Sequence, residues 1–359
     1  MKTYKISEIA GKYKTQGRTT LLNETLIMQW SASGIEFNAE CGGDVLISFN
    51  TMRLENTSES GGAYFSVLID GIMQYADIRI PADNSEDNWR FNSTGYPFHI
   101  KSTGKSSFII AQNLAFGKHK FEIYNQTEAK WASYGICEIA LSGEITAPPQ
   151  DKKIYIEFVG DSVTAGLGNI VKKSKNSPAE IPMFQDALRA WPYLTAKKLN
   201  ADWSVVAVSG IPACEGLGYF GGVSMLTVYP KKLLNGSSEY KSLKCPDVAV
   251  IGLGTNDVAT YKVKGKSIDY LKTGFYKTAE LIRRKNPNTK IIWIYGMITS
   301  DANEIIIRTI EEKGGADNDF YSLALPKNTD GGNGHPGLDA QEIYANAVAD
   351  YILECIKRK

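Results

Sequence analysis

Four short blocks along the chain contain groups that nucleophilic acyl chemistry requires. In chain order they are Gly160-Asp161-Ser162, Ser209-Gly210, Gly254-Thr255-Asn256-Asp257 and His335-Pro336. A serine hydroxyl is a weak nucleophile at its own pKa and needs a base within hydrogen-bond reach. Histidine is the side chain that titrates nearest neutral pH and can serve as that base. The set therefore predicts attack of Ser162 on a carbonyl carbon.

His335 is the predicted base. The chain contains only three histidines. His99 and His119 lie in a strand-rich region ahead of the serine block, so His335 is the only imidazole in the half that contains Ser162. Its place beside Pro336, ahead of the C-terminal helix, supports a catalytic role over a structural one.

Two further blocks predict donors for a negatively charged oxygen. Gly210 lacks a Cβ, so its backbone N–H can approach a tetrahedral intermediate closely. Asn256 offers a side-chain amide, and the backbone N–H of Ser162 adds a third donor. Losing one such donor typically lowers turnover by about 100- to 1000-fold. Asp161 and Asp257, in the same blocks, are interpreted as acceptors for loop backbone N–H groups.

The ordered blocks resemble the SGNH (GDSL-type) hydrolase superfamily, named for a Ser, a Gly, an Asn and a His in separate blocks. A β-rich region ahead of them resembles the layout of carbohydrate esterase family 2, whose members include acetyl xylan esterases. The segments that support this resemblance are residues 160–168, 206–210 and 252–257. The resemblance implies an α/β SGNH-hydrolase three-layer sandwich with a flavodoxin-like parallel sheet, preceded by an all-β jelly-roll domain.

The same resemblance implies a function. It predicts a serine esterase, a carboxylic ester hydrolase that removes O-acetyl groups from acetylated xylan or from xylo- and manno-oligosaccharides. No metal or organic cofactor is required by double displacement through Ser162 and His335. The alternatives are an O-acyltransferase using the same pair, a lipase-like preference for long acyl chains, and a carbohydrate-binding protein without catalysis.

The third member of a catalytic triad is the one departure from the superfamily pattern. SGNH hydrolases usually carry an Asp three residues before the catalytic His, where this chain has Gly332. Asn333 stands two before the His and Asp330 five before. Carbohydrate esterases of the resembled family can carry the acid two before the His, or use a dyad whose imidazole faces a main-chain carbonyl. Asp330, Asn333 and a backbone carbonyl all stay open, the dyad being preferred, while Asp339 has the spacing of a helix cap.

Aromatic residues near the blocks are candidate substrate contacts. Tyr219 and Phe220 lie in a glycine-rich stretch after Gly210, and Trp191 precedes a proline in an amphipathic segment. An aromatic ring offers a flat apolar surface to a sugar ring. Packing in a core is the competing interpretation for all three, and also for Trp131 in the first half.

Residues 1–147 are predicted to form a β-sandwich domain of the jelly-roll type. Short strand-like runs flank turn signals at Gly42-Gly43 and Asp70-Gly71, and residues 120–124 alternate with period two. The prolines of Ala147-Pro148-Pro149-Gln150 stiffen the chain and cannot donate ladder hydrogen bonds, which marks a domain boundary.

Residues 151–359 alternate between strand and helix patterns. Strands are expected at 154–159, 203–208, 248–253, 291–295 and 320–325, and helices at 185–199, 268–285, 303–313 and 339–356. Alternating units of this length predict a parallel sheet covered on both faces. Ligands of such sheets bind beyond the carboxyl ends of the strands, where Ser162, Gly210 and Asn256 fall.

Composition restricts the partners. Of the 359 residues, 40 are basic and 39 acidic, giving a net charge of +1 that favours neither nucleic acid nor an anionic membrane. An acetylated oligosaccharide or polysaccharide fits that balance, and a homo-oligomer stays open. Five cysteines without a Cys-x-x-Cys pair argue against structural zinc and suit a reducing compartment. The first residues lack the apolar core of a secretory signal, so a cytoplasmic location is expected, with secretion if a signal was removed.

Overall fold

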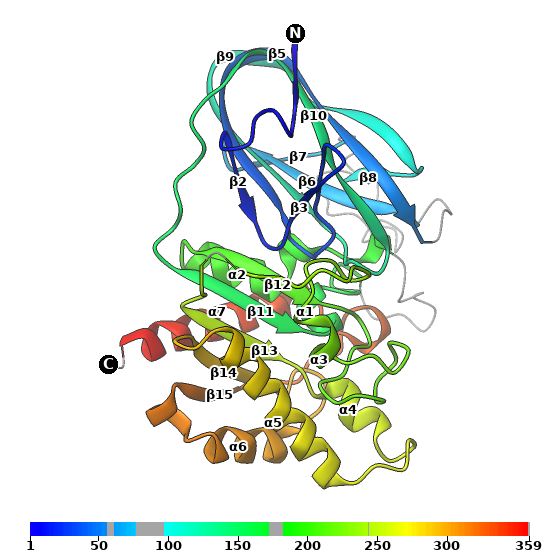
Figure 1. Ribbon diagram of the computed structural model, residues 1–359, viewed down its shortest axis with the longest axis vertical. Helices are drawn as coiled ribbons and strands as arrows, with labels where there is room; N and C mark the ends of the chain where they lie inside the picture. The colour runs from blue at the N-terminus through cyan, green and yellow to red at the C-terminus, as the bar shows by residue number, and fades with distance from the viewer. Residues whose placement is uncertain (56–60, 77–96, 172–181, 243, 358–359) are drawn as a thin grey trace. The chain divides into compact units, whose positions relative to one another are not determined.

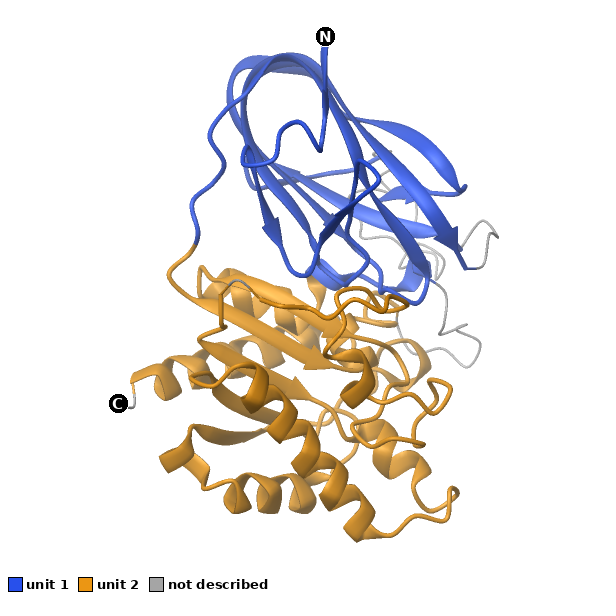
Figure 2. Ribbon diagram, viewed as in Figure 1, with its two compact units in different colours: residues 1–151, 181–188 blue, residues 152–180, 189–359 orange. Residues whose placement is uncertain are grey.

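The structure is a computed structural model that describes residues 1–55, 61–76, 97–171, 182–242 and 244–357. It divides into two compact units (Figure 2). Unit 1 comprises Met1–Asp151 and Ile181–Leu188, and unit 2 comprises Lys152–Glu180 and Arg189–Lys359. Within the described residues no helix has the length and apolarity needed to cross a bilayer.

Unit 1 is built on an antiparallel sheet whose central strands are β5 and β9 (Figure 1). Its strands are β1 Lys2–Lys5, β2 Tyr13–Gln16, β3 Thr20–Leu22, β4 Thr25–Ile27, β5 Gly34–Leu54, β6 Ala63–Ile69, β7 Ile72–Gln74, β8 Phe98–Ile100, β9 Gly104–Asn125 and β10 Ala132–Ile145. The main order of pairing is β3-β4-β10-β5-β9-β6-β7. Apolar side chains from one face of these strands form a core in which Phe37 stacks on Phe121 at 4.8 Å.

The turn expected at Gly42-Gly43 is absent, and β5 runs through it as one strand of 21 residues. The glycines instead mark register shifts between β5 and β9, on both sides of Gly43. A Cβ on Gly42 would lie 2.8 Å from the Cα of Phe116, so close approach of the two backbones accounts for that glycine. By contrast, Asp70-Gly71 does form the tight turn between β6 and β7, and both residues have positive φ.

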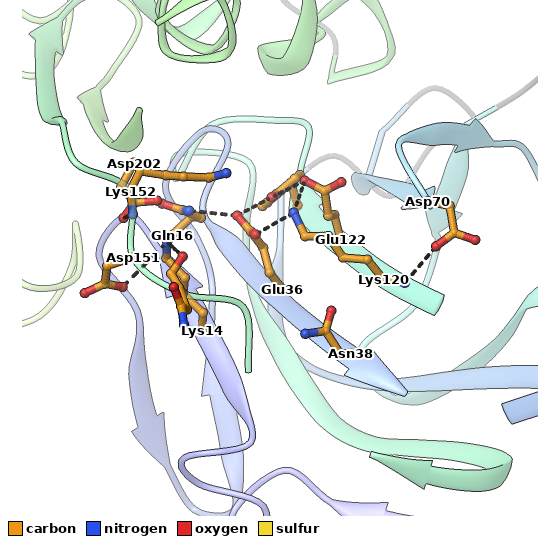
Figure 3. Close-up of polar contacts among 12 residues, drawn as sticks. Lys14, Gln16, Glu36, Asn38, Asp70, Lys120, Glu122, Asp151, Lys152 and Asp202 are labelled. Carbon is orange, nitrogen blue, oxygen red and sulfur yellow. Dashed lines mark hydrogen bonds and ion pairs between the residues drawn. The ribbon is translucent and has the colours of Figure 1, made fainter. Parts of the chain in front are cut away.

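Two buried carboxylates, Glu36 on β5 and Glu122 on β9, share the partly exposed ammonium of Lys120 in unit 1 (Figure 3). The ammonium of Lys120 lies 2.7 Å from the carboxylate of Glu36 and 3.2 Å from that of Glu122. Gln16 and the hydroxyl of Tyr124 also donate hydrogen bonds to Glu36. Burial raises the pKa of Glu36, but these donors outweigh burial and hold that pKa below its usual value. The pairing of β5 with β9 is thus fixed by charge as well as by backbone hydrogen bonds.

Unit 2 contains a parallel sheet in the order β12-β11-β13-β14-β15. Its strands are β11 Tyr155–Gly160, β12 Asp202–Ala207, β13 Val248–Gly252, β14 Lys290–Tyr295 and β15 Phe320–Ala324. Its helices are α1 Ser162–Ala165, α2 Trp191–Lys198, α3 Met225–Val228, α4 Thr255–Thr260, α5 Ile268–Lys285, α6 Asn303–Glu312 and α7 Leu338–Lys357. Numbered along the chain, the strand order is 2-1-3-4-5, the flavodoxin-like arrangement expected from the sequence.

Helices cover both faces of the parallel sheet, which gives three layers (Figure 1). Phe158 on β11 packs against Trp191 of α2, and Trp293 on β14 packs against Phe275 of α5. The sheet register aligns Phe158 with Val250 and Val250 with Ile292, so Trp293 points to the opposite face from Phe158. Helix α7 packs beside α2, and α6 beside α5.

The helix predicted at 185–199 is shorter than expected and begins at Trp191. The cause is tertiary, since residues 185–188, which come before it, belong to unit 1. Gln126 donates to the backbone oxygen of Gln185, and Trp131 donates its indole N–H to the Gln185 side chain at 3.2 Å. Ala187 donates its N–H to the Gln126 oxygen, and residues 187–189 form a single 3₁₀ turn.

Candidate active site

Three neighbouring strands of unit 2 end at the same level and deliver the first three blocks to one edge of the sheet. In the register, Gly160 of β11 pairs with Ala207 of β12 and with Gly252 of β13. Ser162, Gly210 and Asn256 follow these positions by only a few residues. The carboxyl ends of parallel strands share one edge, so the three residues are brought to the same side of the domain.

Ser162 and His335 lie within hydrogen-bond distance, although 173 positions separate them. The Oγ of Ser162 is 2.8 Å from Nε2 of His335. Ser162 is the first residue of α1, and Asp161 caps that helix by accepting from the N–H of Val163 at 3.1 Å. The nucleophile is therefore held at the first turn of a helix, where backbone N–H groups have no intrahelical acceptor.

The other ring nitrogen of His335 faces a backbone carbonyl. Its Nδ1 lies 3.2 Å from the oxygen of Gly332, which can only accept. The proton on the neutral ring is thus assigned to Nδ1, and Nε2 presents a lone pair to the Ser162 hydroxyl. This arrangement fits the dyad with a backbone acceptor that the sequence left open.

Among the described residues, neither Asp330 nor Asn333, the side-chain candidates for the third triad member, forms a hydrogen bond to His335. The carboxylate of Asp330 instead accepts from the side chain of Asn328 at 2.8 Å. Asn333 is exposed and has a left-handed backbone with φ of 53°. Asp339 is exposed and lies in the first turn of α7, where an acidic side chain favours the helix dipole.

The amide of Asn256 connects the serine block to the glycine block. Its Nδ2 donates to the Asp161 carboxylate at 3.2 Å and to the backbone oxygen of Ile211 at 3.1 Å. Asp161 precedes Ser162, and Ile211 follows Gly210. The three predicted oxyanion donors are therefore neighbours in space, with the Asn256 amide between the other two blocks.

Gly210 has the backbone conformation that its predicted role needs. Its φ is +83°, a left-handed value that favours glycine. Within the described residues its N–H donates no hydrogen bond, while its oxygen accepts from the N–H of Tyr219 at 2.8 Å. That bond places Tyr219, whose side chain is 69% exposed, directly against Gly210, with Phe220 next to it and partly buried.

The loop after Gly210 is fixed by the buried carboxylate of Asp257. It accepts from the N–H groups of Ala213 and Cys214 at 2.9 and 2.8 Å, as the sequence interpretation of this Asp as a loop acceptor predicts. Complete burial raises the pKa of Asp257, and these two donors offset only part of that effect. Burial also raises the pKa of the Cys214 thiol well above its usual range, so this cysteine is not activated as a nucleophile.

Trp191 is a core residue, and the predicted substrate contact is wrong for it. Its side chain is fully buried and meets the Phe158 ring edge to face at 5.2 Å, on one face of the sheet. Its backbone N–H donates to the side chain of Gln341 on α7.

Among the described residues there is no group of three or more His, Cys, Asp or Glu side chains able to hold a metal ion.

Sequence reasoning missed one contact of the site. The N–H of Gly332 donates to the oxygen of Gly168 at 2.9 Å, which joins the loop after Ser162 to the loop before His335. Nothing local in the sequence pairs residues so far apart.

Comparisons with known proteins identify a family for the region that contains the four blocks. A profile of the GDSL-like Lipase/Acylhydrolase family matches residues 158–352, which include all four blocks. Cellulase/esterase CelE of Acetivibrio thermocellus is 27% identical over 271 residues, 74% of this chain and 29% of that protein. An acetylxylan esterase / glucomannan deacetylase of Cellvibrio japonicus is 33% identical over 168 residues, 46% of each protein. The chain thus spans less than half the length of either relative.

A solved structure shares the fold over nearly the whole chain. It is a family two carbohydrate esterase from Clostridium thermocellum in complex with cellohexaose, superposing with a TM-score of 0.79 at 21% identity. The match covers 95% of this chain and 98% of the other. The likeness in fold therefore extends over both units.

Proposed function

The chain belongs to the GDSL-like Lipase/Acylhydrolase family, and from this premise we propose that it is a serine esterase that removes O-acetyl groups from hemicellulosic carbohydrates. The observation that supports the proposal most directly is the 2.8 Å contact between Ser162 Oγ and His335 Nε2. A hydroxyl bonded to a neutral imidazole is the activated nucleophile of acyl transfer.

In the first half of the reaction the acetyl group moves to the enzyme. His335 Nε2 takes the hydroxyl proton of Ser162 as Oγ bonds to the acetyl carbon, and the Gly332 carbonyl stabilises the resulting imidazolium through Nδ1–H. The oxyanion is stabilised by the backbone N–H groups of Ser162 and Gly210 and by the Asn256 amide. The bond to the sugar oxygen then breaks, and the imidazolium returns the proton to that oxygen.

In the second half water replaces the sugar. His335 accepts a proton from water as the water oxygen attacks the acetyl carbon of the acyl-enzyme. Collapse of this intermediate releases acetic acid and returns the proton from the imidazolium to Ser162 Oγ. The Asn256 amide must exchange its hydrogen bond to Asp161 or Ile211 for the oxyanion during each half-reaction, because the described structure engages it with both.

Residues around the site and the names of the relatives both support a carbohydrate substrate. The backbone of Tyr219 is bonded to Gly210, and its exposed ring offers an apolar surface to a sugar, with Phe220 next to it in the chain. A net charge of +1 suits a neutral carbohydrate. The two relatives are named as a cellulase/esterase and as an acetylxylan esterase / glucomannan deacetylase.

We extend the proposal to the first unit and to location. Unit 1, with its long antiparallel strands β5 and β9, is proposed to be a jelly roll. Five free cysteines favour a reducing compartment, so we propose that the enzyme acts in the cytoplasm on short acetylated oligosaccharides. Antibody detection in fractionated cells tests the location, and recovery of the protein from the medium would contradict it.

The test of function is acetate release from acetylated xylo- and manno-oligosaccharides, measured in water without acyl-coenzyme A. We expect steady release by the unaltered chain and a loss of about 10⁴-fold or more in kcat for Ser162→Ala and His335→Ala. Intact sugar esters after prolonged incubation would contradict the proposal.

The rival functions give different results in the same assay. An acyltransferase would need an alcohol acceptor and would leave little free acetate. A carbohydrate-binding protein would be unaffected by Ser162→Ala, and a lipase-like enzyme would prefer octanoyl over acetyl 4-nitrophenyl esters.

A further inference from the structure

The loop that follows Ser162 and the loop that precedes His335 are joined through backbone atoms. The N–H of Gly332 donates to the Gly168 oxygen at 2.9 Å. The oxygen of Gly332 accepts from the backbone N–H of His335 at 3.0 Å and lies 3.2 Å from Nδ1 of the same residue. Gly332 thus connects the first loop to the imidazole.

These contacts close a ring around the catalytic pair. The N–H of Leu167 donates to the Ser162 oxygen at 2.9 Å, which ties Gly168 to the helix start that holds the nucleophile. From Gly168 the ring continues through Gly332 to His335 Nδ1, and from Nε2 back to Ser162 Oγ. Nucleophile and base are therefore positioned from one and the same loop.

The bridge requires backbones to approach without side chains between them. A Cβ on Gly168 would lie 2.8 Å from the oxygen of Gly332, closer than real Cβ atoms come. A Cβ on Gly331 would lie 2.8 Å from the oxygen of Gly168 and 2.9 Å from that of His335. A side chain at Gly168 on one loop or at Gly331 on the other would therefore overlap the backbone of the opposite loop.

We propose that Gly168 is a positioning residue for His335, acting through its backbone bridge to Gly332. This role rests on the proposed serine esterase chemistry. In it, the Gly332 carbonyl takes the place of the carboxylate that orients the histidine of a catalytic triad, and Gly168 holds that carbonyl. An uncharged carbonyl orients an imidazolium mainly through geometry, so its own position must be fixed, and the bridge supplies that constraint.

The experiment compares three glycine-to-alanine variants. Gly168→Ala disturbs the bridge from the serine loop, and Gly331→Ala disturbs it from the histidine loop. Gly334→Ala is the matched control for backbone strain, because Gly334 has φ of +70°, close to the +68° of Gly168, yet a Cβ there meets no atom within 4 Å. Each variant is assayed with 4-nitrophenyl acetate over a range of pH, and its thermal unfolding is recorded.

We expect Gly168→Ala and Gly331→Ala to lower kcat by about 10- to 100-fold with KM changed by less than about threefold. The double variant should be no worse than about twofold below the poorer single one, because both break the same bridge. The acid limb of the pH profile should move to lower pH, since a displaced carbonyl no longer favours the charged ring. Gly334→Ala should match its parent in kcat and in pH profile.

Equal losses in Gly168→Ala and Gly334→Ala would overturn the proposal, because strain alone would then explain them. An unshifted pH profile in the folded Gly168→Ala protein would also overturn it. If Gly168→Ala does not fold, Gly331→Ala, whose parent glycine has an ordinary φ of −86°, decides by the same readouts.

Failure of the proposed function gives a separate result. If the unaltered chain releases no acetate, labelling of Ser162 by a fluorophosphonate still measures activation of the hydroxyl by His335. Slower labelling in Gly168→Ala than in Gly334→Ala would support the bridge, and equal rates would refute it.

Discussion

His335 is held by a carbonyl, and this limits what nearby polar residues contribute to catalysis. The carboxylate of Asp330 is engaged by Asn328, and Asn333 is exposed. We therefore expect Asp330→Ala, and Asn333→Gly, which tolerates the left-handed backbone at that position, to keep kcat within about twofold. Acetate release by each purified variant measures this.

His335→Ala serves as the control for that prediction, with an expected loss of about 10⁴-fold or more. A large loss in Asp330→Ala alone would show that the carboxylate reaches the imidazole during turnover. The Asp330 carboxylate would then act as the third triad member after all.

Asp161 has two roles that a conservative substitution can separate. Its carboxylate caps α1 through Val163 and accepts from the amide of Asn256. Asn caps helices as well as Asp does, so Asp161→Asn should unfold within about 2 °C of the parent. Its amide N–H₂ would face another N–H₂ on Asn256, and kcat should fall by about 10- to 100-fold.

Asp161→Ala is the matched variant, since it removes both roles. We expect it to lose about 1 kcal/mol of stability as well as activity. Parent-like turnover in Asp161→Asn would refute a positioning role for the carboxylate and leave only the helix cap.

At the scale of elements, helix α5 packs against the loop that follows Gly210. A Cβ on Gly274 would lie 2.1 Å from the sulfur of Cys214, so Gly274→Ala overpacks this contact. Alanine normally stabilises a helix interior relative to glycine, but here we expect a loss of about 1–3 kcal/mol in the free energy of unfolding. Denaturant unfolding of the variant measures it.

The double variant Cys214→Ala/Gly274→Ala tests the cause. Removing the sulfur relieves the 2.1 Å contact and leaves the Cβ of residue 214 as the nearest atom at 2.8 Å, so the double variant should recover about 1 kcal/mol relative to additive losses. Simple additivity of the two single losses would contradict steric overlap as the explanation.

The turn between β6 and β7 in unit 1 is held by an ion pair that depends on pH. Nδ1 of His119 lies 2.7 Å from the Asp70 carboxylate, and Nε2 lies 2.9 Å from the Ala115 oxygen. The hydrogen bond to Asp70 raises the pKa of His119. Burial raises the pKa of Asp70, but hydrogen bonds from His119 and from the Lys120 N–H outweigh it and lower that pKa.

The signs of these shifts fix the pH range. The raised pKa of His119 stabilises the fold below about pH 6.5, and that contribution is lost as pH rises through the folded value. The lowered pKa of Asp70 stabilises above about pH 4 and is lost as pH falls through its folded value. Asp70→Asn should therefore be most destabilising between about pH 4 and 6.5, by about 0.2–1 kcal/mol for a pair whose carboxylate is about half exposed.

Midpoint temperatures of the parent and Asp70→Asn across pH 3–9 measure this difference. His119→Gln should show the same pH dependence, and in its background Asp70→Asn should add little. A difference that stays constant over the whole range would mean that the pair does not titrate as described.

The elements of unit 2 were predictable because each is locally consistent. The limits predicted for α5 agree with those observed, 268–285, where a Ser267 cap and a basic last turn mark the ends. Local signals failed where tertiary contacts decided. Gly42-Gly43 has the composition of a turn but lies inside β5, and residues 185–188 belong to unit 1 rather than to α2.

Across the whole molecule, the sequence identifies the catalytic residues but not the hydrogen bonds that position them. Ser162 and His335 were identified by residue type and order, and the structure places them 2.8 Å apart. The acceptor for Nδ1 stayed open because a backbone carbonyl has no sequence signal. The bridge from Gly168 to Gly332 was invisible for the same reason, since it joins two main chains.

Net charge is a property of the whole chain, and it predicts how activity depends on salt. With 40 basic and 39 acidic residues there is little long-range field to attract a charged substrate. We expect kcat/KM for a neutral acetylated xylo-oligosaccharide to vary by less than about twofold between 20 and 500 mM NaCl, conditions that shorten the Debye length severalfold. An oligosaccharide with a glucuronic acid substituent provides the comparison, and it should behave the same. A steep fall for the acidic sugar alone would reveal a cationic subsite that the overall charge balance conceals.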